Sequence, residues 1–125
     1  MSRSTNLVIK LASGVEAPER LAQAFTVATT ALASGISVSF WLTGEASWLA
    51  LPGRAQEFHL EHAPSIADSI ATILAAGTLT LCTQCAVRRD IKEEDLISGI
   101  RSAGAATYVE EITADATQHL SISFY

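Results

Sequence analysis

Residues 33–42, ASGISVSFWL, join the end of a helical segment to a strand through one glycine, and this junction decides the fold. Residues 18–34 place apolar side chains on one face at helical spacing, with a proline in the first turn. Gly35 closes that segment, because glycine readily takes the left-handed conformation that ends a helix. Residues 36–42 then return to the apolar pattern of a strand. The stretch therefore predicts a helix that passes at Gly35 into a strand.

The order of helix, glycine and strand occurs three times along the chain. It recurs at residues 75–79 and again at residues 102–105. A strand that follows a helix in this way crosses to a parallel neighbour by a right-handed connection. We therefore expect an α/β fold with three layers, α/β/α, built around about five mostly parallel strands. The expected strands are residues 6–11, 36–42, 79–82, 105–109 and 120–125, and the expected helices are residues 18–34, 45–51, 64–76, 92–103 and 112–118.

The length and composition of the chain restrict its domain organisation and its partners. With 125 residues, of which 49% are hydrophobic and only 17% charged, we expect a single domain over residues 1–125 that buries apolar surface by forming a homo-oligomer. The net charge of -5, without a stripe of basic side chains, argues against nucleic acid as a partner. Neither a secretory signal nor an apolar span of membrane length is recognisable, so we expect a cytoplasmic protein that does not contact a membrane.

The only two cysteines of the chain, Cys82 and Cys85, lie at C-x-x-C spacing at the end of an expected strand. In a reducing compartment this spacing indicates catalysis, redox exchange or metal binding before it indicates a structural disulfide. Arg88 and Arg89 follow closely, and nearby cations favour the thiolate form of a cysteine. We therefore place the chemistry at Cys82 and Cys85, with the two arginines in a supporting role.

Two glycine-bearing loops are expected at the same edge of the sheet as Cys82. In parallel sheets, ligands gather at the carboxyl ends of the strands. Ser13 and Gly14 follow the first strand, and Gly44 follows the second, so we expect these three residues to line a pocket beside the cysteine. Neither loop has the glycine spacing that surrounds a phosphate group with backbone amides, so we expect no cofactor.

Each of these assignments has a less specific alternative. A cysteine at the end of a buried strand often acts as a small apolar side chain, and Arg88 and Arg89 are equally compatible with surface charge. Trp41 fits a packed core or an interface better than a pocket wall. His59 and His62 could complete a zinc site with the cysteines, but their spacing is too loose to specify one, and we expect no metal.

Residues 80–91, TLCTQCAVRRDI, resemble the cysteine segment of the DsrE/DsrF-like family. In that family a strand, a cysteine, often a second cysteine three residues later, an arginine and then Gly-Ile or a similar pair recur. The order of elements along nearly the whole chain is also similar. The resemblance implies a flavodoxin-like three-layer fold and assembly into trimers or hexamers. In the sulfur-relay members it also implies a cysteine that carries a persulfide between partner proteins.

Carried over to this chain, the resemblance assigns the persulfide position to Cys82 and the second cysteine of the C-x-x-C branch to Cys85. Arg89 matches the arginine of the usual Arg-Gly-Ile. Asp90 departs from the family pattern, because glycine is common there, although aspartate enters left-handed conformations more easily than most residues. Its carboxylate would offset positive charge beside the thiols, so the charge balance at the thiols depends on where this carboxylate lies.

Three hypotheses about function follow. The first is a sulfurtransferase-like sulfur carrier, in which Cys82 takes a sulfane sulfur from a donor protein and passes it to an acceptor protein. The second is a thiol-disulfide redox module that uses Cys82 and Cys85. The third is a non-catalytic oligomeric subunit for assembly or ligand binding, since many relatives have no assigned activity. The first fits best, because a carrier needs an accessible thiolate and positive surroundings, and the segment around Cys82 offers both.

Overall fold

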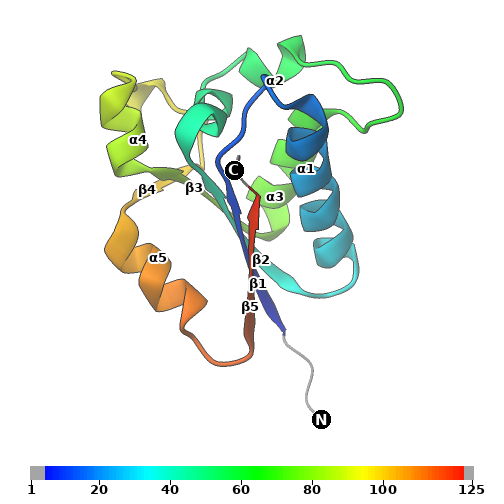
Figure 1. The fold of residues 1–125 in the computed structure, drawn as a ribbon, viewed down its shortest axis with the longest axis vertical. Coiled ribbons are helices and arrows are strands. Elements are labelled where there is room, and N and C mark those ends of the chain that lie inside the picture. Colours follow the sequence, from blue (N-terminus) through cyan, green and yellow to red (C-terminus); the bar gives the residue numbers. More distant parts are fainter. Residues whose placement is uncertain (1–4, 123–125) are drawn as a thin grey trace.

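The computed structural model describes residues 5–122, in which five parallel strands form one sheet (Figure 1). The strands are β1 (Asn6–Leu11), β2 (Ser37–Leu42), β3 (Thr78–Cys82), β4 (Arg101–Ala103) and β5 (Thr117–Ile122). Their order across the sheet is β4-β3-β2-β1-β5, and every neighbouring pair is parallel. β1 pairs with β2 on one side and with β5 on the other, over its whole length in each case.

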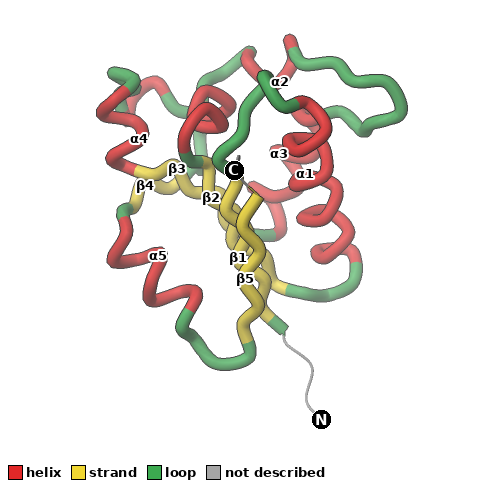
Figure 2. The backbone as a smooth tube through the Cα atoms, viewed as in Figure 1, coloured by secondary structure: helices red, strands yellow, loops and turns green. Residues whose placement is uncertain are grey.

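Helices cover both faces of the sheet, as Figure 2 shows. They are α1 (Pro18–Ala33), α2 (Arg54–Glu57), α3 (Ile66–Ala76), α4 (Thr83–Arg88) and α5 (Ala105–Ile112), with the short 3-10 segments η1 (Gly44–Ala50) and η2 (Glu93–Asp95). α1 and α3 pack together on one face, and α5 lies on the other. The sequence prediction of a three-layer α/β/α, flavodoxin-like fold is therefore confirmed.

The two faces of the sheet differ in character, because successive side chains of a strand point to opposite faces. Ile9 and Phe40 point toward α1 and α3 and are fully buried, and the ring of Phe40 stacks on that of Phe25 with 4.6 Å between ring centres. Trp41 and Arg101 belong to the opposite face and contact α5. One face is thus held by apolar packing, whereas polar groups dominate the other.

Glu111 holds α5 to this polar face. One oxygen of its carboxylate accepts hydrogen bonds from Ser39 Oγ at 2.6 Å and Trp41 Nε1 at 2.9 Å. The other oxygen accepts one from Arg101 Nη2 at 2.6 Å. Burial raises the pKa of Glu111, but these three hydrogen bonds and the charge of Arg101 lower it more, so its pKa lies below the ordinary value of a glutamate. No side chain of α5 is fully buried, which leaves this network as a principal tie between α5 and the sheet.

The helix predicted at residues 92–103 is wrong. Only the single turn η2 is helical before β4, and Gly99 takes a φ of 98°, which a right-handed helix cannot contain. Leu96, Ile97 and Ile100 imitate one face of a helix by their spacing. In the structure they are partly buried loop residues that pack against the core. Their burial explains the apolar pattern without a helix.

The elements after this loop keep the predicted order of strand, helix and strand, but each begins earlier than predicted. The strand is β4, and α5 already starts at Ala105, so the strand predicted at residues 105–109 is wrong, and Gly104 precedes a helix instead of ending one. The helix predicted at residues 112–118 is also wrong, because α5 has ended there and Ala116, with a φ of 56°, turns the chain into β5. Residues 123–125 of the last predicted strand lie outside the described part of the chain.

We expect Glu111→Gln to lower the free energy of unfolding by about 1–3 kcal/mol at neutral pH, because hydrogen bonds to a charged acceptor are among the stronger ones. A carboxyl group whose pKa is lowered by folding stabilises the protein above its unfolded-state pKa, and this contribution disappears as pH falls through the folded-state pKa. The difference between wild type and variant should therefore shrink in acid. Urea unfolding at several pH values measures both effects.

Glu110→Gln is the matched control, because Glu110 is the neighbouring residue on α5 and is exposed. Its loss of charge should change the free energy of unfolding by less than about 0.5 kcal/mol. Equal effects of the two substitutions would show that the Glu111 network does not hold α5 to the sheet.

Candidate functional site

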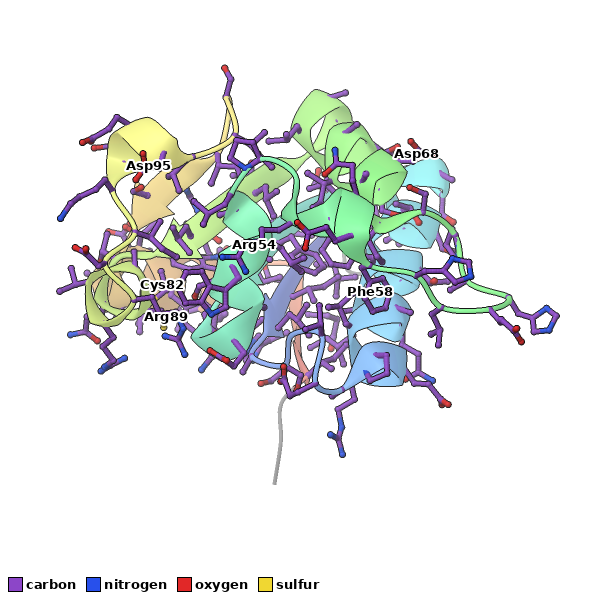
Figure 3. The ribbon with its side chains drawn as sticks, turned by 90° about the horizontal axis from the view of Figure 1, so that it is seen from above. Arg54, Phe58, Asp68, Cys82, Arg89 and Asp95 are labelled. Carbon is purple, nitrogen blue, oxygen red and sulfur yellow. The ribbon has the colours of Figure 1, made fainter. Side chains whose placement is uncertain are left out.

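Cys82 and Cys85 lie where β3 passes directly into α4. Cys82 is the last residue of β3, and α4 begins at the next residue, Thr83. The Cys82 side chain is partly exposed, whereas Cys85 is only 8% exposed. Seen from above, Cys82 and Arg89 lie together on the α4 side of the molecule, away from Phe58 (Figure 3). The more accessible of the two thiols is therefore that of Cys82.

Both cysteines line one pocket of about 350 Å³ at the carboxyl ends of β1, β2 and β3. The start of α5 forms the opposite wall. Lys10 is the one charged side chain among the described residues of the lining. The lining consists of Lys10, Ala12, Trp41, Thr43, Gly44, Cys82, Gln84, Cys85, Gly104, Ala105 and Tyr108. A pocket of this size accommodates a small organic molecule beside a thiol.

Gly44 joins the end of β2 to this pocket. Its backbone N–H donates a hydrogen bond to Cys85 Sγ at 3.3 Å. Its φ is 51°, and a Cβ atom at this position would lie 2.7 Å from the carbonyl oxygen of Ala12. The absence of a side chain thus lets the loop approach β1 and Cys85 together. Among the three loop residues predicted to line the pocket, Gly44 is the one placed with the cysteines.

Ser13 and Gly14 lie in the neighbouring loop, but they do not line the cysteine pocket. Ser13 is 1% exposed, and its hydroxyl has no hydrogen-bond partner among the described residues. Gly14 packs against the backbone of η1, because a Cβ atom there would lie 2.7 Å from the carbonyl oxygen of Glu45. These two residues therefore support the loop that carries Gly44.

The two arginines behind the cysteines differ in their contacts. Arg89 donates from Nη1 to the carbonyl oxygen of Cys85 at 3.2 Å, and its Nε and Nη2 each lie 3.0 Å from Glu45 Oε2. Arg88 is exposed and makes no hydrogen bond or ion pair within residues 5–122. Arg89 thus ties α4 to η1, and Glu45 neutralises its charge.

Asp90 takes the left-handed conformation, which aspartate enters more easily than most residues, with a φ of 54°. The N–H groups of Asp90 and Ile91 donate to the carbonyl oxygens of Val87 and Ala86, the two bonds that close a helix in a Schellman motif. The Asp90 carboxylate lies 2.7 Å from Lys92 Nζ, and this partner lowers the pKa of Asp90 and raises that of Lys92. Lys92 is therefore the cation that Asp90 offsets.

On the far side of the cysteine pocket, the sequence analysis missed Lys10 and Tyr108 and assigned Trp41 to the core or an interface. Lys10, Trp41 and Tyr108 come from β1, β2 and α5. The rings of Trp41 and Tyr108 meet edge to face with 5.2 Å between centres, and the Tyr108 hydroxyl forms a hydrogen bond with the ring of His119. Partial burial raises the pKa of Tyr108. A lysine inside the apolar run of residues 6–11 was the one available signal.

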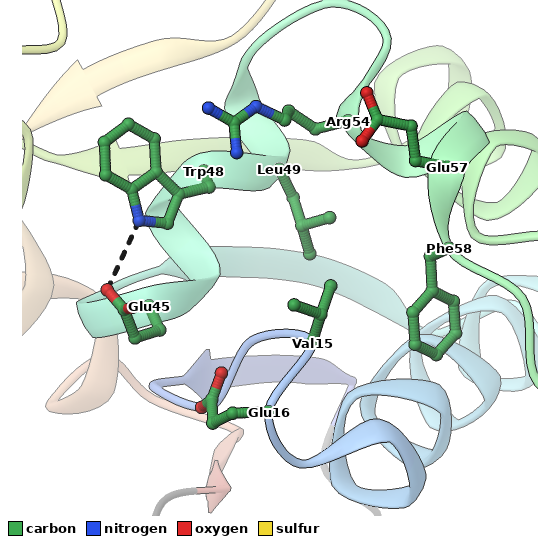
Figure 4. Close-up of a pocket in the computed structure, with 8 residues that line it drawn as sticks. All are labelled: Val15, Glu16, Glu45, Trp48, Leu49, Arg54, Glu57 and Phe58. Atoms are coloured by element: carbon green, nitrogen blue, oxygen red, sulfur yellow. Dashed lines mark hydrogen bonds between the residues drawn. The ribbon is translucent and has the colours of Figure 1, made fainter.

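A second pocket, of about 250 Å³, has Glu45 in its lining (Figure 4). Trp48 Nε1 donates to Glu45 Oε2 at 3.3 Å, and the guanidinium of Arg54 lies 4.9 Å from the centre of the Trp48 ring. Glu16 and Glu57 also line this pocket, and no cysteine does. Its lining is therefore rich in carboxylates, in contrast to that of the cysteine pocket.

Residues 5–122 contain neither a metal-binding cluster nor a helix suited to span a membrane. No three His, Cys, Asp or Glu side chains there converge in a way that suits a metal ion. His59 and His62 lie in the connection between α2 and α3, whereas the cysteines lie at the end of β3 and in α4. None of the helices in this part of the chain combines the length and the hydropathy that a bilayer crossing requires.

The chain is similar to one protein family and to solved structures. The model of the DsrE/DsrF-like family matches residues 6–121. The crystal structure of the ychN protein from E. coli has a TM-score of 0.73 at 18% identity, with 97% of this chain and 99% of that chain covered. MTH1491 from Methanobacterium thermoautotrophicum, a protein of unknown function, has a TM-score of 0.68 at 8% identity, with 93% and 97% covered. Such low identities show the fold alone, and no curated protein matches the chain.

We expect Gly44→Ala to destabilise the protein by about 2–4 kcal/mol, because a side chain there combines left-handed backbone strain with a clash against the Ala12 carbonyl. Gly35→Ala is the matched control, since Gly35 has a φ of 80° but open space around it. It should cost only about 1 kcal/mol. Urea unfolding of both variants measures the difference, and equal losses would contradict a tight approach of Gly44 to β1.

Proposed function

Because the chain belongs to the DsrE/DsrF-like family, we propose that it is a sulfur-relay protein in which Cys82 carries a persulfide. The observation that carries the proposal is the position of Cys82, a partly exposed thiol at the carboxyl end of β3 in the wall of a pocket. In a parallel sheet, reacting groups gather at the edge formed by the carboxyl ends of the strands. The sulfurtransferase-like activity would need no resident cofactor, because the thiol itself holds the sulfur.

The transfer is a nucleophilic substitution at sulfur. The Cys82 thiolate attacks the outer sulfur of a donor persulfide, R–S–SH. A bond forms between Cys82 Sγ and that sulfur, the S–S bond of the donor breaks, and the donor leaves as the thiolate R–S⁻ with the electron pair. An acceptor thiolate later attacks the outer sulfur of the Cys82 persulfide in the same way, which restores the Cys82 thiolate. Neither step consumes an oxidant or a reductant.

Cys85 has the features of a second thiol. It lines the same pocket as Cys82 but is nearly buried, and its sulfur accepts the Gly44 N–H. Its thiolate could attack the inner sulfur of the Cys82 persulfide, which forms a Cys82–Cys85 disulfide and releases hydrosulfide. A cellular dithiol would then have to reduce the disulfide. The shared pocket also favours thiol-disulfide exchange as a second candidate function, and either role suits the reducing cytoplasm.

We expect wild-type protein treated with mercaptoethanol persulfide to gain the mass of one sulfur atom at Cys82. Cys82→Ser should gain none, because it lacks the attacking thiolate, whereas Cys85→Ser should still gain one. Intact-protein and peptide mass spectrometry without reductant locate the added sulfur. Cys85→Ser is the matched control for the loss of one thiol from the same pocket.

Two outcomes of this experiment would contradict the assignment of the persulfide to Cys82. Equal sulfur gain by Cys82→Ser would remove Cys82 from the carrier role. A wild-type product that is a Cys82–Cys85 disulfide without retained sulfur would favour the redox module, and its reduction potential would then have to lie in the cytosolic range.

We also propose that the protein assembles into a trimer or hexamer through surfaces near the cysteines. Val87 on α4 is 78% exposed, and Val109 on α5 is 52% exposed. Exposed apolar side chains of this kind favour burial against another copy. A protein that accepts the sulfur would then approach the assembly. Nucleic acid is not expected as a partner, because the chain has no stripe of basic side chains.

Sedimentation equilibrium should show a trimer or hexamer for wild-type protein, and Val87→Asp should shift the equilibrium toward monomer by about tenfold or more, because it buries a charge at the contact. Val27→Asp is the control, since Val27 is an exposed valine of α1, on the opposite side of the sheet from α5. A monomeric wild type, or equal effects of the two substitutions, would contradict the proposed surface.

A further inference from the structure

Lys10 brings a positive charge into the cysteine pocket from β1, an interior strand of the sheet. It lies on β1 level with Trp41 of β2 and Ser121 of β5. Its Nζ atom lies 5.5 Å from the centre of the Tyr108 ring. Interior strands of parallel sheets are normally apolar, and lysine is rarely buried without a partner. A partly buried lysine at this position therefore calls for an explanation beyond packing.

No carboxylate within residues 5–122 neutralises Lys10. The chain has one other lysine, Lys92, which pairs with Asp90 at 2.7 Å. Two arginines near the pocket are also paired, Arg89 with Glu45 and Arg101 with Glu111, and Arg88, unpaired within residues 5–122, is not part of the lining. Lys10 forms no ion pair with any described residue. No acidic side chain lines the cysteine pocket. Within the described part of the chain, the positive charge that lines the pocket is therefore uncompensated, which favours an anionic ligand.

The size and walls of the pocket indicate more than an inorganic anion. Its volume is about 350 Å³, and the rings of Trp41 and Tyr108 form part of its wall. An inorganic anion would leave most of this space and the aromatic surface without contacts. Ligand pockets of this volume commonly hold an organic body against apolar walls, with a few polar groups that fix its orientation. Lys10 is the charged group available for that purpose.

We infer that the pocket selects a low-molecular-weight organic persulfide that carries a carboxylate, and that Lys10 binds this carboxylate while Cys82 takes the sulfur. The inference rests on the proposed function and names its donor class. In the transfer, the Cys82 thiolate attacks the outer sulfur of the donor, the donor's S–S bond breaks, and the donor departs as a thiolate that still carries its carboxylate. Lys10 is thus a specificity residue that contacts the donor away from the reacting sulfur.

The test compares three donors of similar size and different charge: the persulfides of mercaptoacetate, mercaptoethanol and cysteamine. Rapid mixing followed by mass spectrometry gives the second-order rate constant for loading of Cys82. Wild type should load from mercaptoacetate persulfide about fivefold faster than from mercaptoethanol persulfide, with the cysteamine compound slowest. Added salt should reduce this preference.

Lys10→Met should bring the ratio of the anionic to the neutral donor down to about one, and Lys10→Arg should keep most of the preference, because it keeps the charge. Lys92→Met is the matched control, since it removes the other lysine, which lies on the surface and outside the pocket. It should leave the ratio at the wild-type value. Lys10→Gln provides a second neutral variant in case Lys10→Met does not fold.

Three results would overturn the inference. A wild type that loads equally from all three donors shows that the pocket does not select an anion. Neutral variants at Lys10 that keep the wild-type ratio show that another group makes the selection. Failure of Cys82 to load from any of the three donors overturns the proposed function itself, and with it the donor class, so the two failures are distinguishable.

Discussion

The parallel pairing of β1 with β2 and β5 fixes the positions on which the site depends. Because six residues of β1 pair on each side, the carboxyl ends of three strands finish level with one another. Beyond the paired residues, the N–H of Thr43 donates to the Leu11 carbonyl and that of Glu45 to the Ala12 carbonyl. These bonds hold the loop after β2 against the end of β1, and there Gly44 reaches Cys85. The contact between glycine and cysteine is thus a consequence of strand register.

The charges around the cysteines are arranged differently from the expectation drawn from the sequence. The segment after the C-x-x-C pair predicts that arginines stabilise a thiolate, but Arg89 contacts the carbonyl of Cys85 and the carboxylate of Glu45. Its bonds position α4 against η1. The positive charge that lines the pocket is that of Lys10, which lies in the first strand, far from Cys82 in the sequence. A local motif therefore identified the thiols, and a distant strand supplies their electrostatic surroundings.

The fold was predictable where a single periodicity fits the residues. The apolar run of β1 and the helical face of α1 were predicted within a residue or two, and Gly35 does take a left-handed φ of 80°. Residues 92–112 were not predictable in this way, because buried loop residues there share the spacing of a helical face. In the site, the C-x-x-C motif and the tendency of ligands to gather at the carboxyl ends of parallel strands predicted that Cys82, Cys85 and Gly44 share one pocket. Tyr108 required the connection from β4 across the sheet to β5, which no local pattern specifies.

Helix α5 forms one wall of the cysteine pocket, yet it buries no side chain completely. Its attachment consists largely of hydrogen bonds and ring contacts made by Glu111 and Tyr108. The free energy needed to open this helix is therefore set by a few polar contacts, and the apolar core between α1, α3 and the sheet stays intact when it opens. In hydrogen exchange, the amides of α5 would belong to a cooperative unit separate from that core. One wall of the cysteine pocket thus belongs to a part of the protein that can unfold locally while the core remains folded.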